Sequence, residues 1–127
     1  MEDRPFQKRP LSERLAQYAL VQQRYPSTGG TGGMPLFVVL EPVKGQMPLR
    51  GIKTLLAFRG THTFNDVIYG LRTRMSMAPS EALFLYVRGN YVIMPNRTIA
   101  DVHRDYVNAE DGFLYISYCR EHVFGAN

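Results

Sequence analysis

The residues with the clearest chemical meaning stand at the very end of the chain, where Val123, Phe124, Gly125, Ala126 and Asn127 follow a run of strand-forming residues. This tail is too short, and at its end too polar, to dock as an element, so we expect it to project into solvent. Glycine has no Cβ, and another enzyme can therefore approach its backbone through a narrow channel. The sequence predicts that the tail is the substrate of another enzyme.

Other reactive side chains give weaker signals. Cys119 and His122 could form a thiol and base pair, but side chains at this spacing in and just after a strand need not face each other, and a structural cysteine is favoured. His62, His103 and Cys119 lack a recognised metal spacing. The glycines of residues 27–33 are followed by no Gly-Lys-Ser/Thr, so a linker is favoured over a phosphate loop. We expect no catalytic residue, no metal and no cofactor.

Composition indicates an ordinary soluble globular protein. The 127 residues suffice for one domain with one core, and the hydrophobic share of 45% and charged share of 20% are typical values. The single cysteine excludes an internal disulfide, and no apolar run of membrane-spanning length or leader-like N-terminus occurs, which predicts a cytoplasmic location. The net charge of +4 comes from scattered residues, so no nucleic-acid partner is expected.

Local signals predict the helices. A short helical turn over residues 6–9 ends at Pro10. A helix capped by Ser12 ends at Tyr25, before Pro26. Thr63 and Thr98 each have an aspartate three residues later, the pattern of a capping box, and each opens a helix. The expected apolar faces are, in chain order, Leu11, Leu15, Tyr18, Ala19, Gln22 and Tyr25; then Phe64, Val67, Ile68, Leu71 and Met75; then Ile99, Val102, His103 and Tyr106.

Strands are expected over residues 36–40, 52–58, 83–87, 91–93 and 113–118. In the second, Lys53, Leu55 and Ala57 should face one way and Ile52, Thr54, Leu56 and Phe58 the other. The order of strands and helices is that of an α+β ubiquitin-like β-grasp, in which the first and last strands lie parallel at the centre of the sheet. The predicted parts are a helical extension (1–26) added on the far face, a glycine-rich loop (27–35), the β-grasp core (36–122) and a flexible tail (123–127).

Several segments together resemble a known family. They are Pro5-Phe-Gln-Lys-Arg9, Arg24-Tyr-Pro26, Arg72-Thr-Arg74, Ala82-Leu-Phe-Leu-Tyr-Val87, Asp111-Gly-Phe-Leu-Tyr-Ile-Ser-Tyr118 and Phe124-Gly125. The chain resembles the GABARAP-type autophagy modifiers, ubiquitin-like proteins attached to phosphatidylethanolamine. This resemblance implies that a cysteine protease removes Ala126-Asn127, and that activating and conjugating enzymes pass Gly125 as a thioester to the lipid on autophagosomal membranes. The chain would be the cargo of this chemistry and not an enzyme.

The same resemblance implies a peptide site at the edge of the second strand, where cargo receptors and adaptors add a short extended motif. Lys53 would face an acidic peptide residue. The aromatic pocket would draw on Val21, Pro35, Phe37, Lys53, Ala57 and Phe113, and the aliphatic pocket on Leu56, Phe58, His62, Val67 and Leu71. Phe37, Val67 and Leu71 could equally be core residues.

Other segments depart from this family. The helix before Tyr25 is longer, and Thr54-Leu-Leu-Ala-Phe-Arg59 replaces the family's usual sequence. Residues 39–49 and Tyr118-Cys119 instead resemble the sister Atg-twelve-type modifier, which is joined through its terminal glycine to a lysine of a protein. A plain β-grasp interaction domain that binds microtubules or acidic surfaces through Lys8, Arg9 and Arg14 is a third alternative. The N-terminal segment and the Asp-Gly-Phe-Leu-Tyr strand favour the lipid-conjugated branch.

Overall fold

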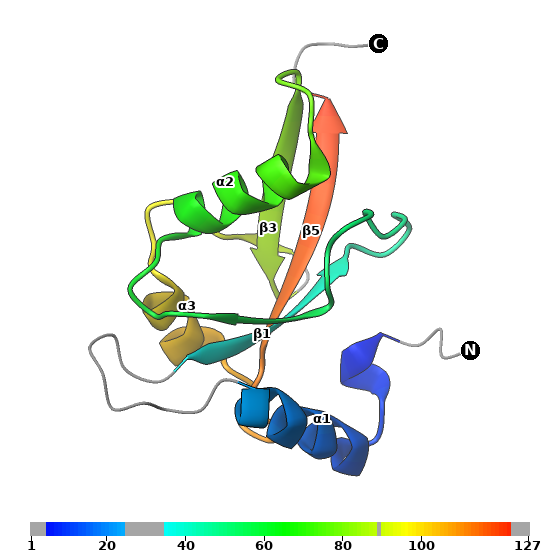
Figure 1. Cartoon of the computed structure of the whole chain (residues 1–127), viewed down its shortest axis with the longest axis vertical. Coiled ribbons are helices and arrows are strands. Elements are labelled where there is room, and N and C mark those ends of the chain that lie inside the picture. Colours follow the sequence, from blue (N-terminus) through cyan, green and yellow to red (C-terminus); the bar gives the residue numbers. More distant parts are fainter. Residues whose placement is uncertain (1–4, 25–34, 89, 123–127) are drawn as a thin grey trace.

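The computed structural model describes residues 5–24, 35–88 and 90–122, which form one mixed sheet with helices on both faces (Figure 1). The strands are β1 (Leu36–Pro42), β2 (Leu55–Phe58), β3 (Glu81–Val87), β4 (Tyr91–Val92) and β5 (Leu114–His122). Their order across the sheet is β2-β1-β5-β3-β4. The central pair β1 and β5 is parallel and the other pairs are antiparallel, as the sequence predicts.

The central strand β1 is apolar on both of its faces. Val38 and Leu40 belong to the core on one side of the sheet, and Phe37 and Val39 belong to the core on the other side. A strand covered on both faces is a continuous hydrophobic run, because neither set of alternating side chains meets water. The run Leu36–Leu40 in the sequence therefore reflects two separate cores.

The helices α2 (Phe64–Met75) and α3 (Ile99–Tyr106) follow β2 and β4, and α2 crosses one face of the sheet (Figure 1). Their apolar residues Phe64, Ile99 and Val102 are fully buried in the core on this side. The side chain of Thr63 accepts from the N–H of Asp66, and the carboxylate of Asp66 accepts from the N–H of Thr63, which completes the capping box. Thr98 accepts from the N–H of Asp101 in the same way. Both predicted helix starts are confirmed.

The Thr63 cap gives a test of how helix starts contribute to stability. Thr63→Ala is expected to lower the free energy of unfolding by about 1 kcal/mol, because an N–H at the start of α2 loses its acceptor. Ser12→Ala is the matched control and should change the free energy of unfolding by under about 0.5 kcal/mol, since exposed positions away from caps contribute little. Urea denaturation followed by circular dichroism measures both variants, and equal losses would contradict the assigned caps.

The helix α1 (Leu11–Arg24) starts earlier than predicted, and its buried face differs from the predicted one. Ser12 lies in its first turn and is not the cap. The buried residues of the helix are Arg14 and Val21, with Tyr18 packed against the same core, whereas Leu11 and Leu15 are 36% and 45% exposed. The apolar periodicity was therefore misleading, because a cation at position 14 has a buried partner in the turn before β5 and this side of the helix faces inward.

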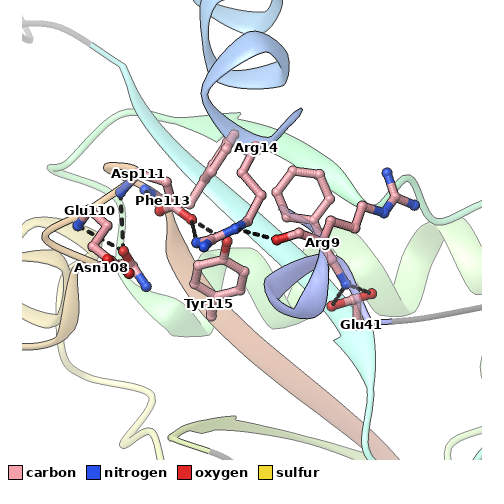
Figure 2. A network of polar contacts seen from close by, with 9 residues as sticks. Arg9, Arg14, Glu41, Asn108, Glu110, Asp111, Phe113 and Tyr115 are labelled. Atoms are coloured by element: carbon pink, nitrogen blue, oxygen red, sulfur yellow. Dashed lines mark hydrogen bonds and ion pairs between the residues drawn. The ribbon is translucent and has the colours of Figure 1, made fainter. Parts of the chain in front are cut away.

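That partner is Asp111, and Figure 2 shows how the two residues meet. Arg14 Nη1 donates to Asp111 Oδ2 at 2.6 Å and Arg14 Nε donates to the carbonyl of Arg9 at 3.0 Å. The hydroxyl of Tyr115 also donates to Asp111 Oδ2, and the N–H of Phe113 donates to Oδ1 at 2.9 Å. Every oxygen of this buried carboxylate has a donor, so the cost of burying its charge is offset.

The pKa shifts agree with this arrangement. Burial lowers the pKa of Arg14, but its hydrogen bonds with Asp111 and Tyr115 outweigh this effect and the net shift is upward. Burial and the bond to Asp111 raise the pKa of Tyr115 well above its usual value. The guanidinium therefore stays charged and the phenol stays protonated, so both remain donors to Asp111.

The short 3-10 helix η1 (Phe6–Lys8) is held on the same face of the sheet. The N–H of Phe6 donates to the two carboxylate oxygens of Glu41 at 3.0 and 3.3 Å (Figure 2). Phe6 is 2% exposed, and its ring packs edge-on against Phe113, with ring centroids 5.3 Å apart. The N-terminal helices thus lie on the far face of the sheet from α2, as predicted.

The boundaries of all five strands differ from the predicted ones; β1, for example, extends to Pro42 and β4 ends at Val92. β2 begins at Leu55, although Thr54 still accepts from the N–H of Leu40 at 2.7 Å. β5 continues to His122, because β3 begins at Glu81 and provides pairing partners along this length. The predicted boundaries that fall at residues 25–34 and 123–127, including the glycine-rich loop and the tail, lie outside the described residues.

Candidate functional site

The strand β2 lies at one edge of the sheet and pairs with β1 along its inner side. In residues 35–88 and 90–122 no other strand pairs with it. Leu55 and Ala57 pack against the core under α1, and Leu56 and Phe58 pack against the core under α2, which confirms the predicted alternation. An edge strand has unpaired N–H and C=O groups, and an extended peptide can add to them.

Lys53 lies two residues before β2, and its side chain is exposed. An exposed ammonium on a flexible stem can pair with a carboxylate without losing packing. The sequence places Lys53 within the strand, and the structure places it just outside, where it can face a residue at one end of an added peptide.

Four of the six residues predicted to form the aromatic pocket come together in the structure, and Pro35 and Lys53 are not part of their cluster. Val21 of α1, Phe37 of β1 and Phe113 before β5 form one buried cluster, and their exposed fractions are 7%, 2% and 0%. Ala57 of β2 packs against this cluster, and Pro35 is partly exposed just before β1. Phe37 and Phe113 are therefore both pocket candidates and members of the core under α1.

The aromatic cluster also contains a ring that the sequence did not assign to it. Tyr18 of α1 lies edge-on to Phe37, with ring centroids 5.0 Å apart, and to Phe113, at 5.1 Å. The helical spacing of Tyr18 and Val21, three residues apart, could have indicated that they share a face.

Beside the end of β2 the surface is hollowed. A cavity of about 330 Å³ is lined by Ala57, Phe58, Arg59, His62, Asp66 and Val67. Phe58, His62 and Val67 were predicted for the aliphatic pocket. Leu56 and Leu71 were also predicted, but they are not part of this lining: Leu71 is buried in the core under α2, and Leu56 packs against that core. The structure therefore brings together part of the predicted aliphatic pocket.

Polar side chains also line this cavity, and two of them, Arg59 and Asp66, were not predicted from the sequence. Asp66 Oδ2 lies 3.7 Å from His62 Nδ1 and also accepts from the N–H of Thr63 at 3.3 Å. Arg59 adds a third polar side chain. The cavity combines an apolar floor of Phe58 and Val67 with a polar mouth, and it can take the apolar part of a peptide side chain while its charged groups stay in water.

The residues predicted for conjugation and processing, Phe124, Gly125 and Ala126, lie outside the described residues. The strand that leads to them is β5, whose described part ends at His122. Cys119 of this strand is buried, and its Sγ accepts from Gln46 Nε2 at 3.2 Å. Burial and the nearby Glu121 raise the pKa of the Cys119 thiol, so the thiol stays protonated and is a poor nucleophile.

Within the residues that the structure describes, no three His, Cys, Asp or Glu side chains are grouped so that they could hold a metal ion. None of the helices in the same residues is long and apolar enough to cross a bilayer.

Comparison with known proteins identifies the family. The family model "Autophagy protein Atg8 ubiquitin like" matches residues 37–125. The chain is 28% identical over 123 residues to the human protein microtubule-associated protein 1 light chain 3 gamma, covering 96% of this chain and 79% of that relative. It is 29% identical over 116 residues to autophagy-related protein 8d of Arabidopsis thaliana, covering 91% and 89%.

A solved structure shares the fold. The crystal structure of Trypanosoma brucei ATG8 superposes with a TM-score of 0.72 at 23% sequence identity, covering 98% of this chain and 100% of that one. This match confirms the predicted ubiquitin-like α+β fold, and the family model confirms the resemblance found in the sequence. The chain belongs to the Atg8 family of ubiquitin-like autophagy modifiers.

Proposed function

We propose that the chain is processed after Gly125 and joined through this residue to phosphatidylethanolamine on autophagosomal membranes. A cysteine protease would remove Ala126 and Asn127, and activating and conjugating enzymes would carry Gly125 as a thioester to the lipid amine. Membership of the Atg8 family supports this proposal. The unconjugated chain would be cytoplasmic.

We also propose that the chain recruits cargo receptors and adaptors through short peptides that add to the edge of β2. The observation that carries this proposal is the open edge of β2 between exposed Lys53 and the cavity at Phe58 and Val67. Main-chain hydrogen bonds along the edge would give affinity, and the pockets and Lys53 would select the side chains.

The intact mass of the chain, recovered from its own cells in membrane and soluble fractions, tests the conjugation proposal. We expect the membrane pool to lack Ala126-Asn127 and to carry a lipid-sized increment. A chain extended by a whole protein through an isopeptide bond at Gly125 would instead identify a protein acceptor. An unprocessed, unmodified chain in every fraction would contradict conjugation and would favour the alternative of a plain interaction domain.

Lys53→Glu tests the peptide site. The variant should bind an extended peptide that has acidic residues beside its aromatic anchor about tenfold more weakly, because an attractive charge pair becomes a repulsive one. Calorimetry at low salt measures the change. Lys44→Glu, the same charge reversal at an exposed position in the loop after β1, is the control and should bind within about twofold of the wild type. Equal affinities of the wild type and Lys53→Glu would contradict the placement of the peptide.

A further inference from the structure

The ring of Tyr18 lies in a slot formed by residues of the predicted aromatic pocket. Its plane is at 87° to Phe37 and at 69° to Phe113, the edge-to-face geometry that aromatic pairs prefer. Phe37 belongs to β1, and Phe113 is the residue just before β5. The ring of Tyr18 therefore contacts the chain at both of the central strands.

The third wall of the slot is the backbone of Gly112. A Cβ placed on Gly112 would lie 3.0 Å from Cε2 of Tyr18 and 3.3 Å from its Cζ, closer than ordinary van der Waals contact. The φ angle of Gly112 is +82°, a conformation that glycine adopts without strain. Two separate features therefore favour glycine at position 112. The turn has a positive φ, and the ring of Tyr18 occupies the space that a side chain would need.

Tyr18 is partly buried against this cluster, and this burial raises the pKa of its hydroxyl. The residues around it are those that an aromatic peptide anchor would contact: Val21 is one turn further along α1, and Ala57 of the edge strand packs against the same cluster. An anchor entering between α1 and β2 would seek the edge-to-face contacts with Phe37 and Phe113 that Tyr18 already makes.

We propose that Tyr18 occupies the aromatic pocket as a resident ring, and that it determines specificity by disfavouring peptides with a large aromatic first anchor. The inference rests on the proposed peptide site at β2. Two rings cannot share one slot, so an aromatic anchor must first displace Tyr18. The contacts of Tyr18 with Phe37 and Phe113 are then lost before the anchor makes its own. A small aliphatic anchor needs less room and leaves Tyr18 in place.

The test compares two peptides that differ at the first anchor alone. Both are extended and have acidic residues before the first anchor and Leu as the second anchor; one has Trp and the other Val at the first anchor. Calorimetry with the full chain gives the dissociation constant of each peptide for the wild type, Tyr18→Ala, Tyr18→Leu and Tyr18→Phe. Tyr18→Leu keeps an apolar side chain that favours helix, so it guards against loss of α1 in the alanine variant.

The expected result is a change in specificity. Tyr18→Ala and Tyr18→Leu should bind the Trp peptide about tenfold more tightly, since the two ring contacts no longer have to be broken. The Val peptide should change by less than about twofold in these variants, and Tyr18→Phe, which keeps the ring, should stay within about twofold for both peptides. If Tyr18 had only a structural role, the two peptides would not respond differently, because a loosened α1 would weaken the binding of both.

The other outcomes separate the inference from the proposal on which it rests. If the wild type binds and removal of the ring leaves the Trp peptide unchanged or weaker, Tyr18 is a wall of the pocket or part of the core, and the inference is wrong. If neither the wild type nor any variant binds either peptide, the proposed peptide site is wrong and the inference falls with it.

Discussion

Replacing Gly125 by alanine is expected to reduce the conjugated, membrane-bound form of the chain about a hundredfold or more in cells that contain the conjugation enzymes, the scale of loss caused by misplacing reacting atoms by an ångström. Under the proposed function, Gly125 would have to reach the active sites of a protease, an activating enzyme and a conjugating enzyme in turn. A Cβ restricts both its φ and its approach in each narrow channel. Because the steps follow one another, their losses multiply.

The matched control is Asn127→Ala, which changes a residue that the proposed processing would remove and should leave the conjugated fraction unchanged. Fractionation followed by intact mass spectrometry measures both variants. An undiminished conjugate in Gly125→Ala would show that conjugation does not require a glycine at this position and would contradict the prediction. The peptide site at β2 would still be testable, because a plain interaction domain does not need the glycine.

The second large effect is expected at the ion pair that holds α1 on the sheet. Arg14→Leu should lower the free energy of unfolding by about 3–5 kcal/mol, because it leaves the carboxylate of Asp111 buried without its cation. The side chains of Arg14 and Asp111 are 9% and 0% exposed, so water cannot replace the lost partner. Denaturant unfolding followed by fluorescence of the tyrosines measures the change.

Arg97→Leu is the matched control for this prediction. Arg97 Nη2 lies 2.7 Å from Asp105 Oδ2, nearly the same separation as in the buried pair, but the two side chains are 33% and 44% exposed. Loss of this exposed pair should lower the free energy of unfolding by at most about 1 kcal/mol, since solvent screens its charges. Similar losses in Arg14→Leu and Arg97→Leu would show that burial does not set the strength of these pairs.

Removing both members of the buried pair is not expected to restore stability. Asp111 also accepts from the N–H of Phe113 and from the hydroxyl of Tyr115, and its own N–H is held by the side chain of Asn108 at 3.1 Å. A double change to leucine would leave buried donors without acceptors. The carboxylate therefore anchors the turn before β5 as well as α1.

The sequence by itself determined the elements whose signals are local. The capping box of Thr63 and Asp66 spans three residues, and the alternation from Leu55 to Phe58 follows from the pleat of a strand. The parallel central pair followed from the order of the elements, since a crossover must join parallel strands. The family was likewise visible in short segments, and the Atg8 family model confirmed it.

Only the tertiary structure decided which side of α1 is buried and what surrounds the candidate pockets. Arg14 faces inward because Asp111, 97 positions away, supplies its partner, and no window of local sequence contains both residues. For the same reason the sequence could not place the ring of Tyr18 against Phe37 and Phe113 or assign Arg59 and Asp66 to the cavity beside β2. Helix and strand periodicity depend on neighbours in the chain, whereas burial and pocket walls depend on residues that only folding brings together.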